Sequence, residues 1–187
     1  MFQLDLAFDA TGITLSPSEE CRLTEESWWT VPVQEWIETI RCDLDLECPI
    51  LVRQADEISL GLRLTDDTNI AELNGIWRER PEPTDVLSFA ALDQTSDRFE
   101  APCIELGDII VSLETARRQA IEQAHSLSRE LDWLVTHGLL HLLGWDHPDD
   151  ASLKRMLAVQ EHLLENRGNV QARGIHPVDA NSIRDAH

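Results

Sequence analysis

The sequence has no apolar run that approaches the roughly 20 residues needed to cross a bilayer, so we expect no membrane partner. Its four cysteines form no Cys-x-x-Cys pair, and the acidic, alternating first eight residues do not resemble an export signal. These absences favour reduced thiols and a cytoplasmic protein. At 187 residues the chain is long enough for one well-packed domain.

Positive charge is also scarce. Fifteen basic residues stand against 35 acidic ones, which gives a formal net charge of −20. Nucleic-acid binding usually depends on clustered positive charge, so this balance argues against a DNA partner and weakens the case for RNA. All but one of the fifteen basic residues are arginines, the side chain best shaped to hold phosphate through two bonds. The local field at the site therefore matters more than the total charge.

Histidines are concentrated in one short segment, His137-Gly-Leu-Leu-His-Leu-Leu-Gly-Trp-Asp-His147. His137 and His141 are four residues apart, so on a helix they lie one turn apart on the same face. Gly144 can end that helix in the left-handed conformation, and the chain can then return His147 to the same ion. A buried, hydrogen-bonded core histidine is the usual explanation for one such residue, but it does not explain this spacing. The segment therefore predicts a metal site.

Zinc is the expected ion, one per chain, because neutral imidazole suits it, although nickel, copper and iron also accept imidazole. Three histidines leave the fourth position of a tetrahedral site open to water, which is typical of catalytic zinc. The segment therefore indicates an enzyme.

Hydrophobic periodicity predicts a mixture of strands and helices without strict alternation. We expect strands at 1–8 (at a sheet edge), 56–64, 86–89 and 108–112, and helices from Pro32, after Asp66-Asp67, at 113–123, at 126–143 and after Asp149-Asp150. The predicted fold class is α+β, with a small mixed sheet packed against several helices. The metal site would lie on a central helix and the loop that follows it.

The remaining segments are predicted to be irregular. We expect one domain over 1–167 with an insertion at about 9–32, which is irregular at 15–30. The polar stretch 91–105 is typical of a surface loop, and 168–187 of a disordered tail. Trp77 and Trp145 could stack on bases, but burial in the core is the prediction for both.

Three blocks of the sequence together resemble the YbeY family of bacterial zinc-dependent single-strand endoribonucleases. The first is the histidine segment, and the second is Leu73-Asn-Gly-Ile-Trp-Arg78 followed by Pro83-Thr-Asp-Val-Leu-Ser-Phe89. The third is Leu106-Gly-Asp-Ile-Ile-Val-Ser112. Trp77 and Trp145 stand where tyrosine is common in the family, and Ala90 where proline is frequent.

This resemblance implies zinc bound by His137, His141 and His147, with His137 and Arg78 in the catalytic site. It also implies a role in maturing the 3′ end of small-subunit (16S) rRNA and in ribosome quality control. The implied partners are single-stranded RNA, such as an rRNA precursor, and the ribosomal subunit or its proteins.

Phosphoryl transfer needs a cation on the non-bridging oxygens, and Arg78 is the residue we expect to supply it. Asp85, Ser88 and Asp108 are candidates for binding substrate or orienting a histidine. Asp85 could equally close a turn through its own backbone. The nucleophile could be zinc hydroxide or the RNA 2′-hydroxyl, and the residues do not decide between them.

Two alternatives to a nuclease remain. His-x-x-x-His-x-x-Gly-x-x-His is also the ligand spacing of metzincin peptidases, but those enzymes have a glutamate after the first histidine, where this chain has Gly138. A non-catalytic, zinc-containing ribosome assembly factor would fit the acidic composition. The open coordination position argues against that factor, since structural zinc usually has four protein ligands.

Overall fold

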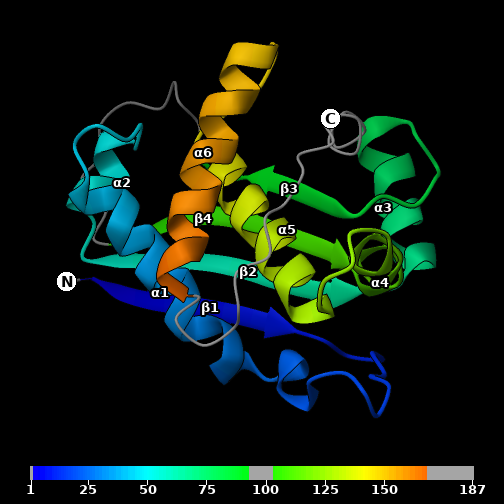
Figure 1. The fold of residues 1–187 in the computed structure, drawn as a ribbon. Coiled ribbons are helices and arrows are strands. Elements are labelled where there is room, and N and C mark those ends of the chain that lie inside the picture. The colour runs from blue at the N-terminus through cyan, green and yellow to red at the C-terminus, as the bar shows by residue number, and fades with distance from the viewer. Residues whose placement is uncertain (1, 93–102, 168–187) are drawn as a thin grey trace.

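A computed structural model describes residues 2–92 and 103–167 of the chain. These residues form a four-stranded sheet, six α-helices and one 3₁₀ helix (Figure 1). The elements are β1 (Gln3–Asp9), the 3₁₀ helix η1 (Cys21–Thr24), α1 (Glu26–Cys42), α2 (Ile50–Gln54), β2 (Glu57–Thr65), α3 (Asp67–Arg78), β3 (Val86–Ala90), β4 (Cys103–Ser112), α4 (Leu113–Glu122), α5 (Leu127–Leu142) and α6 (Asp150–Arg167).

The sheet is mixed, as the sequence predicted. Its strand order is β1-β2-β4-β3, in which β1, β2 and β4 run parallel and β3 runs antiparallel to β4. The first strand lies at one edge, also as predicted, and β3 lies at the other. Ser88 of β3 pairs with Ile109 of β4, a register that becomes important at the functional site.

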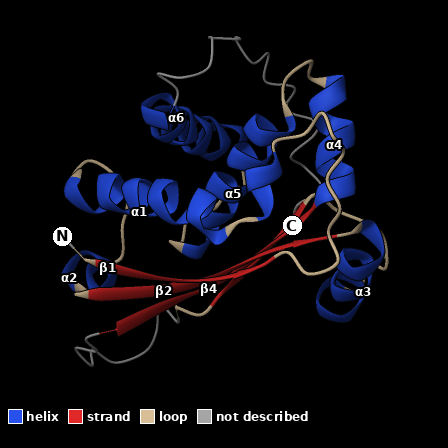
Figure 2. Ribbon diagram, turned by 90° about the horizontal axis from the view of Figure 1, so that it is seen from below, coloured by secondary structure: helices blue, strands red, loops and turns tan. Residues whose placement is uncertain are grey.

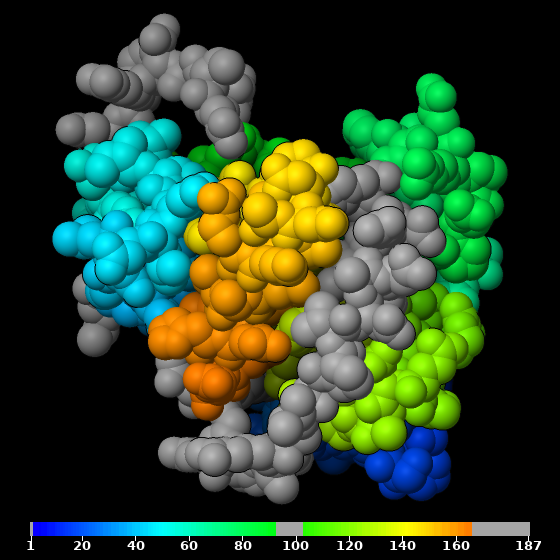
Figure 3. All heavy atoms as spheres, turned by 45° about the horizontal axis from the view of Figure 1, so that its top comes forward, coloured from blue at the N-terminus to red at the C-terminus, as the bar shows by residue number. Residues whose placement is uncertain are grey.

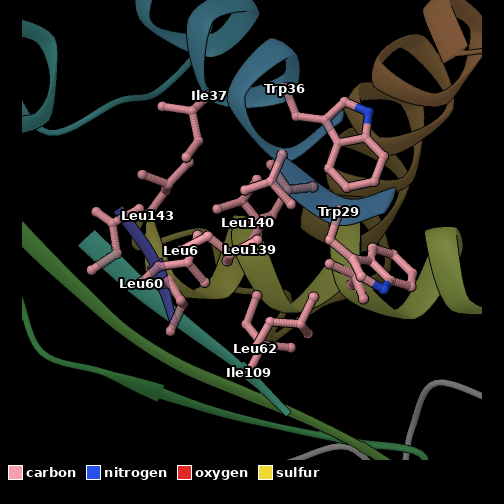
Figure 4. Close-up of a cluster of buried hydrophobic side chains, with 14 of the residues drawn as sticks. Leu6, Trp29, Trp36, Ile37, Leu60, Leu62, Ile109, Leu139, Leu140 and Leu143 are labelled. Carbon is pink, nitrogen blue, oxygen red and sulfur yellow. The ribbon is translucent and has the colours of Figure 1, made fainter. Parts of the chain in front are cut away.

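The main core lies between the sheet and helices α1 and α5, and α6 packs on these two helices from the side away from the sheet (Figure 2). Every second residue of β2 from Ile58 to Leu64 is buried, because successive side chains of a strand point to opposite faces. Figure 4 shows Leu60 and Leu62 of this strand with the tryptophans of α1 and the leucines of α5. The helix that carries the histidine pair is therefore central to the fold.

The opposite face of the sheet is covered in part by α3. Ile70 of α3 packs with Leu87 and Ile110 in a second, smaller cluster. Leu87 and Ile110 pair across β3 and β4, so they point to the same side, away from α5. The two faces of β3 therefore contact different helices, α5 on one side and α3 on the other.

The helices begin where the sequence supplies capping side chains. Asp66 accepts a hydrogen bond from the Asn69 amide at the start of α3, and Asp149 accepts from the Ser152 amide at the start of α6. Ser112 and Ser126 cap α4 and α5 in the same way.

On one face of the molecule the outer surface of α6 lies beside the region around α2 (Figure 3). No helix within the described ranges has the length and apolar character of a membrane span.

The predicted start of the first helix was wrong. We expected Pro32 to open it after an irregular stretch, but η1 precedes it and α1 begins at Glu26, so Pro32 lies inside the helix. Proline there removes one helical hydrogen bond. Trp29 continues the buried stripe of Val33, Trp36, Ile37 and Ile40 towards the N-terminus, and its indole donates to the carbonyl of Leu23. This burial outweighs the lost bond.

Two further predictions were partly or wholly wrong. Strand β4 begins at Cys103, five residues earlier than expected, because the left-handed Gly107 (φ 120°) interrupts the alternation between Leu106 and Ile109. A side chain at Gly107 would meet the carbonyl oxygen of Phe89.

Trp77 is 68% exposed rather than buried, whereas Trp145 is buried as predicted. The predicted tail at 168–187 and most of the 91–105 loop lie outside the described residues.

Candidate metal centre

The histidine pair lies on the last two turns of α5. His137 is 3% exposed and His141 is half-buried. The helix ends at Leu142, and Gly144 has a positive φ of 91°, as its position predicted. Its amide donates to the carbonyl of His141, and the Trp145 amide donates to the carbonyl of Leu140. The chain therefore reverses direction tightly at this point.

The reversal is anchored by Trp145. Its indole nitrogen donates to the Glu47 carbonyl at 2.9 Å, and the ring is buried against the core. Asp146 then accepts a hydrogen bond from the amide of His147, as expected of a turn-forming residue. As a result, His147 returns to the end of α5 from which the chain departed.

The three imidazole rings converge. One nitrogen from each ring lies within 4.8 Å of the others, and the ring centroids are 4.7 to 5.5 Å apart. The Nε2 atoms of His137 and His141 are 3.1 Å apart. With Zn–N bonds of about 2.1 Å, two nitrogens of a tetrahedral site lie about 3.4 Å apart. The helical pair therefore has the spacing of two ligands of one ion.

The other nitrogen of each helical histidine has a fixed acceptor. His141 Nδ1 donates to the carbonyl of Trp145 at 2.9 Å. His137 Nδ1 is 3.3 Å from Gln160 Oε1, and Gln160 Nε2 donates to the Trp133 carbonyl at 2.8 Å. Because that carbonyl only accepts, the Gln160 amide must present its oxygen to His137. Both rings therefore carry their proton on Nδ1.

The protons on Nδ1 of His137 and His141 bear on whether the site suits a metal ion. When neutral imidazoles are protonated on Nδ1, each Nε2 presents a lone pair. Two lone pairs 3.1 Å apart repel each other, unless a cation lies between them. Neutral imidazole nitrogens suit zinc among the common divalent ions. The residues present thus fit a metal ion, and the contacts behind them fix their orientation.

Gln160 was not among the residues selected from the sequence. It lies on α6, is fully buried, and continues the apolar stripe formed by Leu153, Met156, Leu157 and Leu163. A buried polar residue needs a hydrogen-bond partner. The position of Gln160 within an apolar stripe was therefore the feature of the sequence that could have marked it as a residue with a specific partner. Its partner could not be identified because the packing of α6 against α5 does not follow from local sequence.

Replacing Gln160 with leucine is expected to weaken metal binding about 10-fold to 100-fold, the usual effect of losing an outer contact to a ligating histidine. The His137 ring would lose the acceptor that sets its proton and its orientation. Competition with a chromophoric chelator measures the change. Met156→Leu, at another buried position of α6, should leave the metal affinity unchanged. Equal affinities for Gln160→Leu and the wild type would contradict a role for Gln160 at the metal.

Gly138 allows α5 to pack closely on the sheet. A Cβ atom there would lie 2.8 Å from Ile109 Cγ2 and 3.0 Å from Ser88 Oγ. A glutamate, which a metzincin-type peptidase needs at this position, would require both neighbours to move. The same contact places the candidate residue Ser88 against α5, directly beside the position that follows His137.

Asp85 lies at the start of β3, next to α4. Its carboxylate accepts hydrogen bonds from Gln119 Nε2 at 2.9 Å and from the Val86 amide at 2.8 Å. Burial raises the pKa of this carboxyl, and the hydrogen bonds from Gln119, Val86 and Thr84 oppose that rise. These contacts attach the beginning of β3 to α4, and none of them involves the three histidines.

Asp108 points away from α5. It is exposed, and its neighbour Ile109 faces Gly138 on the other side of the sheet. Asp108 pairs with Gly61 and Phe89, and a Cβ atom at Gly61 would collide with its carboxylate. The fold therefore does not bring Asp108 to the histidines, which are oriented by Gln160 and the carbonyl of Trp145 instead.

Arg78 is the last residue of α3 and is half-buried. Burial lowers the pKa of its guanidinium, and the nearby charge of Arg80 lowers it further. Arginine nevertheless stays charged at neutral pH. Two other arginines that the sequence offers lie elsewhere: Arg117 forms an ion pair with Glu19 at 2.6 Å, and Arg118 forms one with Asp67 at 2.8 Å. These two arginines hold surface segments together.

A mixed sheet covered by helices, with three imidazoles from one helix and the loop after it, defines an α+β domain with a candidate metal site. Three protein ligands, the number found for this cluster within the described residues, would leave a tetrahedral ion one further position, as in metal-dependent hydrolases. The family model described as endoribonuclease YbeY matches residues 24–168. The chain belongs to this family.

Individual relatives agree with the family match. The endoribonuclease YbeY of Parasynechococcus marenigrum (strain WH8102) is 55% identical, and the similarity covers 99% of this chain and 100% of that protein. The endoribonuclease YbeY of Synechococcus sp. (strain CC9605) is 59% identical over 87% of this chain and 98% of that protein. A solution structure of a Thermotoga maritima protein has a TM-score of 0.50 at 23% identity, over 86% of this chain and 87% of that one, which supports the fold alone.

Proposed function

We propose that this chain is a zinc-dependent endoribonuclease that cuts single-stranded RNA and matures the 3′ end of small-subunit rRNA. The observation that carries the proposal is the convergence of three imidazoles, two of them with Nδ1 engaged and Nε2 directed at one point. The names of the relatives, endoribonuclease YbeY, supply the substrate class.

His137, His141 and His147 would hold the zinc ion. When bound, such an ion would supply Lewis acidity towards a phosphoryl oxygen and would lower the pKa of a water molecule bound to it. Gln160 and the Trp145 carbonyl keep the proton of each helical ring on Nδ1, so that Nε2 remains a donor to the metal. Ser88, which lies against α5 at Gly138, the residue after His137, is a candidate for contacting substrate.

Arg78 would hold the non-bridging oxygens of the scissile phosphate. Its guanidinium is partly desolvated and lies close to the positive charge of Arg80. A phosphate bound by both arginines would offset the repulsion between their charges. A guanidinium can also form two parallel hydrogen bonds to a phosphate, which fixes the phosphate's orientation. A protein of net charge −20 can in this way present a local positive site to RNA.

The partners that we propose are an rRNA precursor and the ribosomal subunit or its proteins, in the cytoplasm and as part of ribosome quality control. The acidic composition would help the chain to dock on basic ribosomal proteins. The same property favours a second candidate, a zinc-containing assembly factor without catalysis. The two differ in whether purified protein alone cuts RNA.

The test compares metal-loaded protein, chelator-treated protein and protein to which zinc has been restored. Each is incubated with an unstructured RNA oligonucleotide, the corresponding DNA, an RNA duplex and casein. We expect only single-stranded RNA to be cut, with loss of cleavage on chelation and recovery with zinc. Cleavage of casein without RNA cleavage would favour a peptidase. Co-sedimentation with ribosomal subunits without any RNA cleavage would favour the assembly factor.

A further inference from the structure

Trp77 is unusual among the tryptophans of the chain. All six tryptophans lie within the described residues, and Trp77 alone is classed as exposed, at 68%. A large aromatic ring on the surface is costly to keep in water, because about 25 cal/mol per Å² of apolar area is gained by burying it. A single exposed apolar side chain is common on protein surfaces, but this one adjoins Arg78, the residue proposed to hold phosphate, which makes Trp77 a candidate for contacting the same RNA strand.

The Trp77 ring is supported from one side. It contacts Phe89 of β3, with the ring centroids 5.8 Å apart and the planes inclined at 61°. This edge-to-face contact is a favourable arrangement of two aromatic rings. It restrains the indole against the sheet, so a partner that stacks on the indole needs to order little further structure.

The segment after Trp77 is also fixed. Asn74 is buried and donates through its side chain to the carbonyl of Glu82, while its own carbonyl accepts from the Arg80 amide. A Cβ atom at Gly75 would lie 3.2 Å from Pro81, so the loop packs directly against α3. The indole and the two arginines that follow it are therefore presented on a well-anchored turn.

Strand β3 connects this surface with the metal centre. Ser88 faces α5 beside the position after His137, and the next residue, Phe89, faces the side of α3 and Trp77. Consecutive residues of a strand point to opposite faces, and β3 is the last strand in the sheet order. A flexible chain that crosses this edge of the sheet can contact both surfaces.

We propose that Trp77, supported by Phe89, is a stacking platform for an unpaired base of the RNA strand where that strand passes over the β3 edge from the metal centre, and that it gives the enzyme its preference for single strands. The inference rests on the proposed function and adds a subsite to it. Every base offers a π-face, so stacking suits RNA of any sequence but requires a base that is not enclosed in a duplex. With a net charge of −20, the chain has few phosphate contacts to offer, which makes base stacking the more important source of affinity.

The experiment measures kcat and KM of the zinc-loaded enzyme on a single-stranded RNA dodecamer. We expect Trp77→Ala to raise KM about tenfold with kcat nearly unchanged, the order of effect of losing one base–aromatic stack. Trp77→Phe should retain most of the affinity. Ile76→Ala is the matched control, because Ile76 is 71% exposed on the neighbouring position of the same helix and should leave both constants unchanged.

A set of dodecamers that each lack one base near the cut identifies the stacked nucleotide. At one position the missing base should raise KM of the wild type by the same factor, and should add nothing in Trp77→Ala, because both changes remove the same contact. Two results would overturn the platform and leave the proposed function intact, provided that the wild type cuts RNA. One is a KM of Trp77→Ala equal to that of the wild type. The other is a wild-type KM that does not change when any single base near the cut is removed. A wild-type protein that cuts no RNA would overturn both. If Trp77→Ala does not fold, the base-removal series on the wild type decides.

Discussion

Replacing His141 with alanine is expected to release the metal ion and to reduce RNA cleavage by about a thousandfold or more. His141 Nε2 lies 3.1 Å from His137 Nε2, and its Nδ1 is held by the Trp145 carbonyl, so the ring is oriented for the ion before the ion binds. Two remaining imidazoles from different directions form a much weaker site than three. Metal content by mass spectrometry and cleavage of a labelled oligonucleotide measure the two losses.

The matched control is His162→Ala. His162 is exposed on α6 and lies outside the histidine cluster, so its removal should change neither metal content nor cleavage. Stoichiometric metal in the His141→Ala protein would refute the assigned ligand set. Loss of metal without loss of cleavage would instead separate the metal from the reaction and favour a structural ion.

Replacing Arg78 with alanine is expected to lower kcat/KM for single-stranded RNA by about 100-fold to 1000-fold while the metal content stays at the wild-type value. The guanidinium is half-buried near Arg80, so two positive charges would act on a phosphate bound there. Arg78→Lys should recover only part of the loss, because an ammonium keeps the charge but cannot form two parallel bonds to one phosphate. Steady-state kinetics and metal analysis of the same preparations measure both effects.

Arg63→Ala provides the control for charge. Arg63 lies on β2, is about half exposed and forms an ion pair with Asp9 at 3.4 Å. Replacing it removes one positive charge, as Arg78→Ala does, but at a position outside the candidate site. We expect its kcat/KM to stay within about twofold of the wild type. If Arg63→Ala and Arg78→Ala lose cleavage equally, the effect comes from overall charge, and Arg78 has no specific role.

The fold class and most elements could be predicted because they depend on local periodicity. Alternate burial from Ile58 to Leu64 marks β2, and Asp66 and Ser126 mark the starts of α3 and α5 by capping chemistry. The start of α1 was mispredicted because a strong local signal, Pro32, was weighed above Trp29, whose burial depends on its packing against the core.

In the candidate site too, features that depend on local sequence were predicted, and features that depend on tertiary packing were not. The four-residue spacing of His137 and His141 and the glycine after them are local features, and they were sufficient to expect that both rings and His147 would meet. The position of Asp108 depended on which face of β4 is covered by α5. That choice is made by the packing of helices on the sheet, and Gly107 shifts the alternation just before it.

Residue spacing along the chain was sufficient to predict most of the helices and strands, the histidine cluster and the family. Only the tertiary structure assigned Gln160 to His137, placed Asp108 on the far face of the sheet and left Trp77 exposed beside Phe89. The physical reason is that these contacts join residues far apart in sequence. Their geometry is set by how α3 and α5 pack on the two faces of the sheet and how α6 packs on α5, and no local pattern encodes that arrangement.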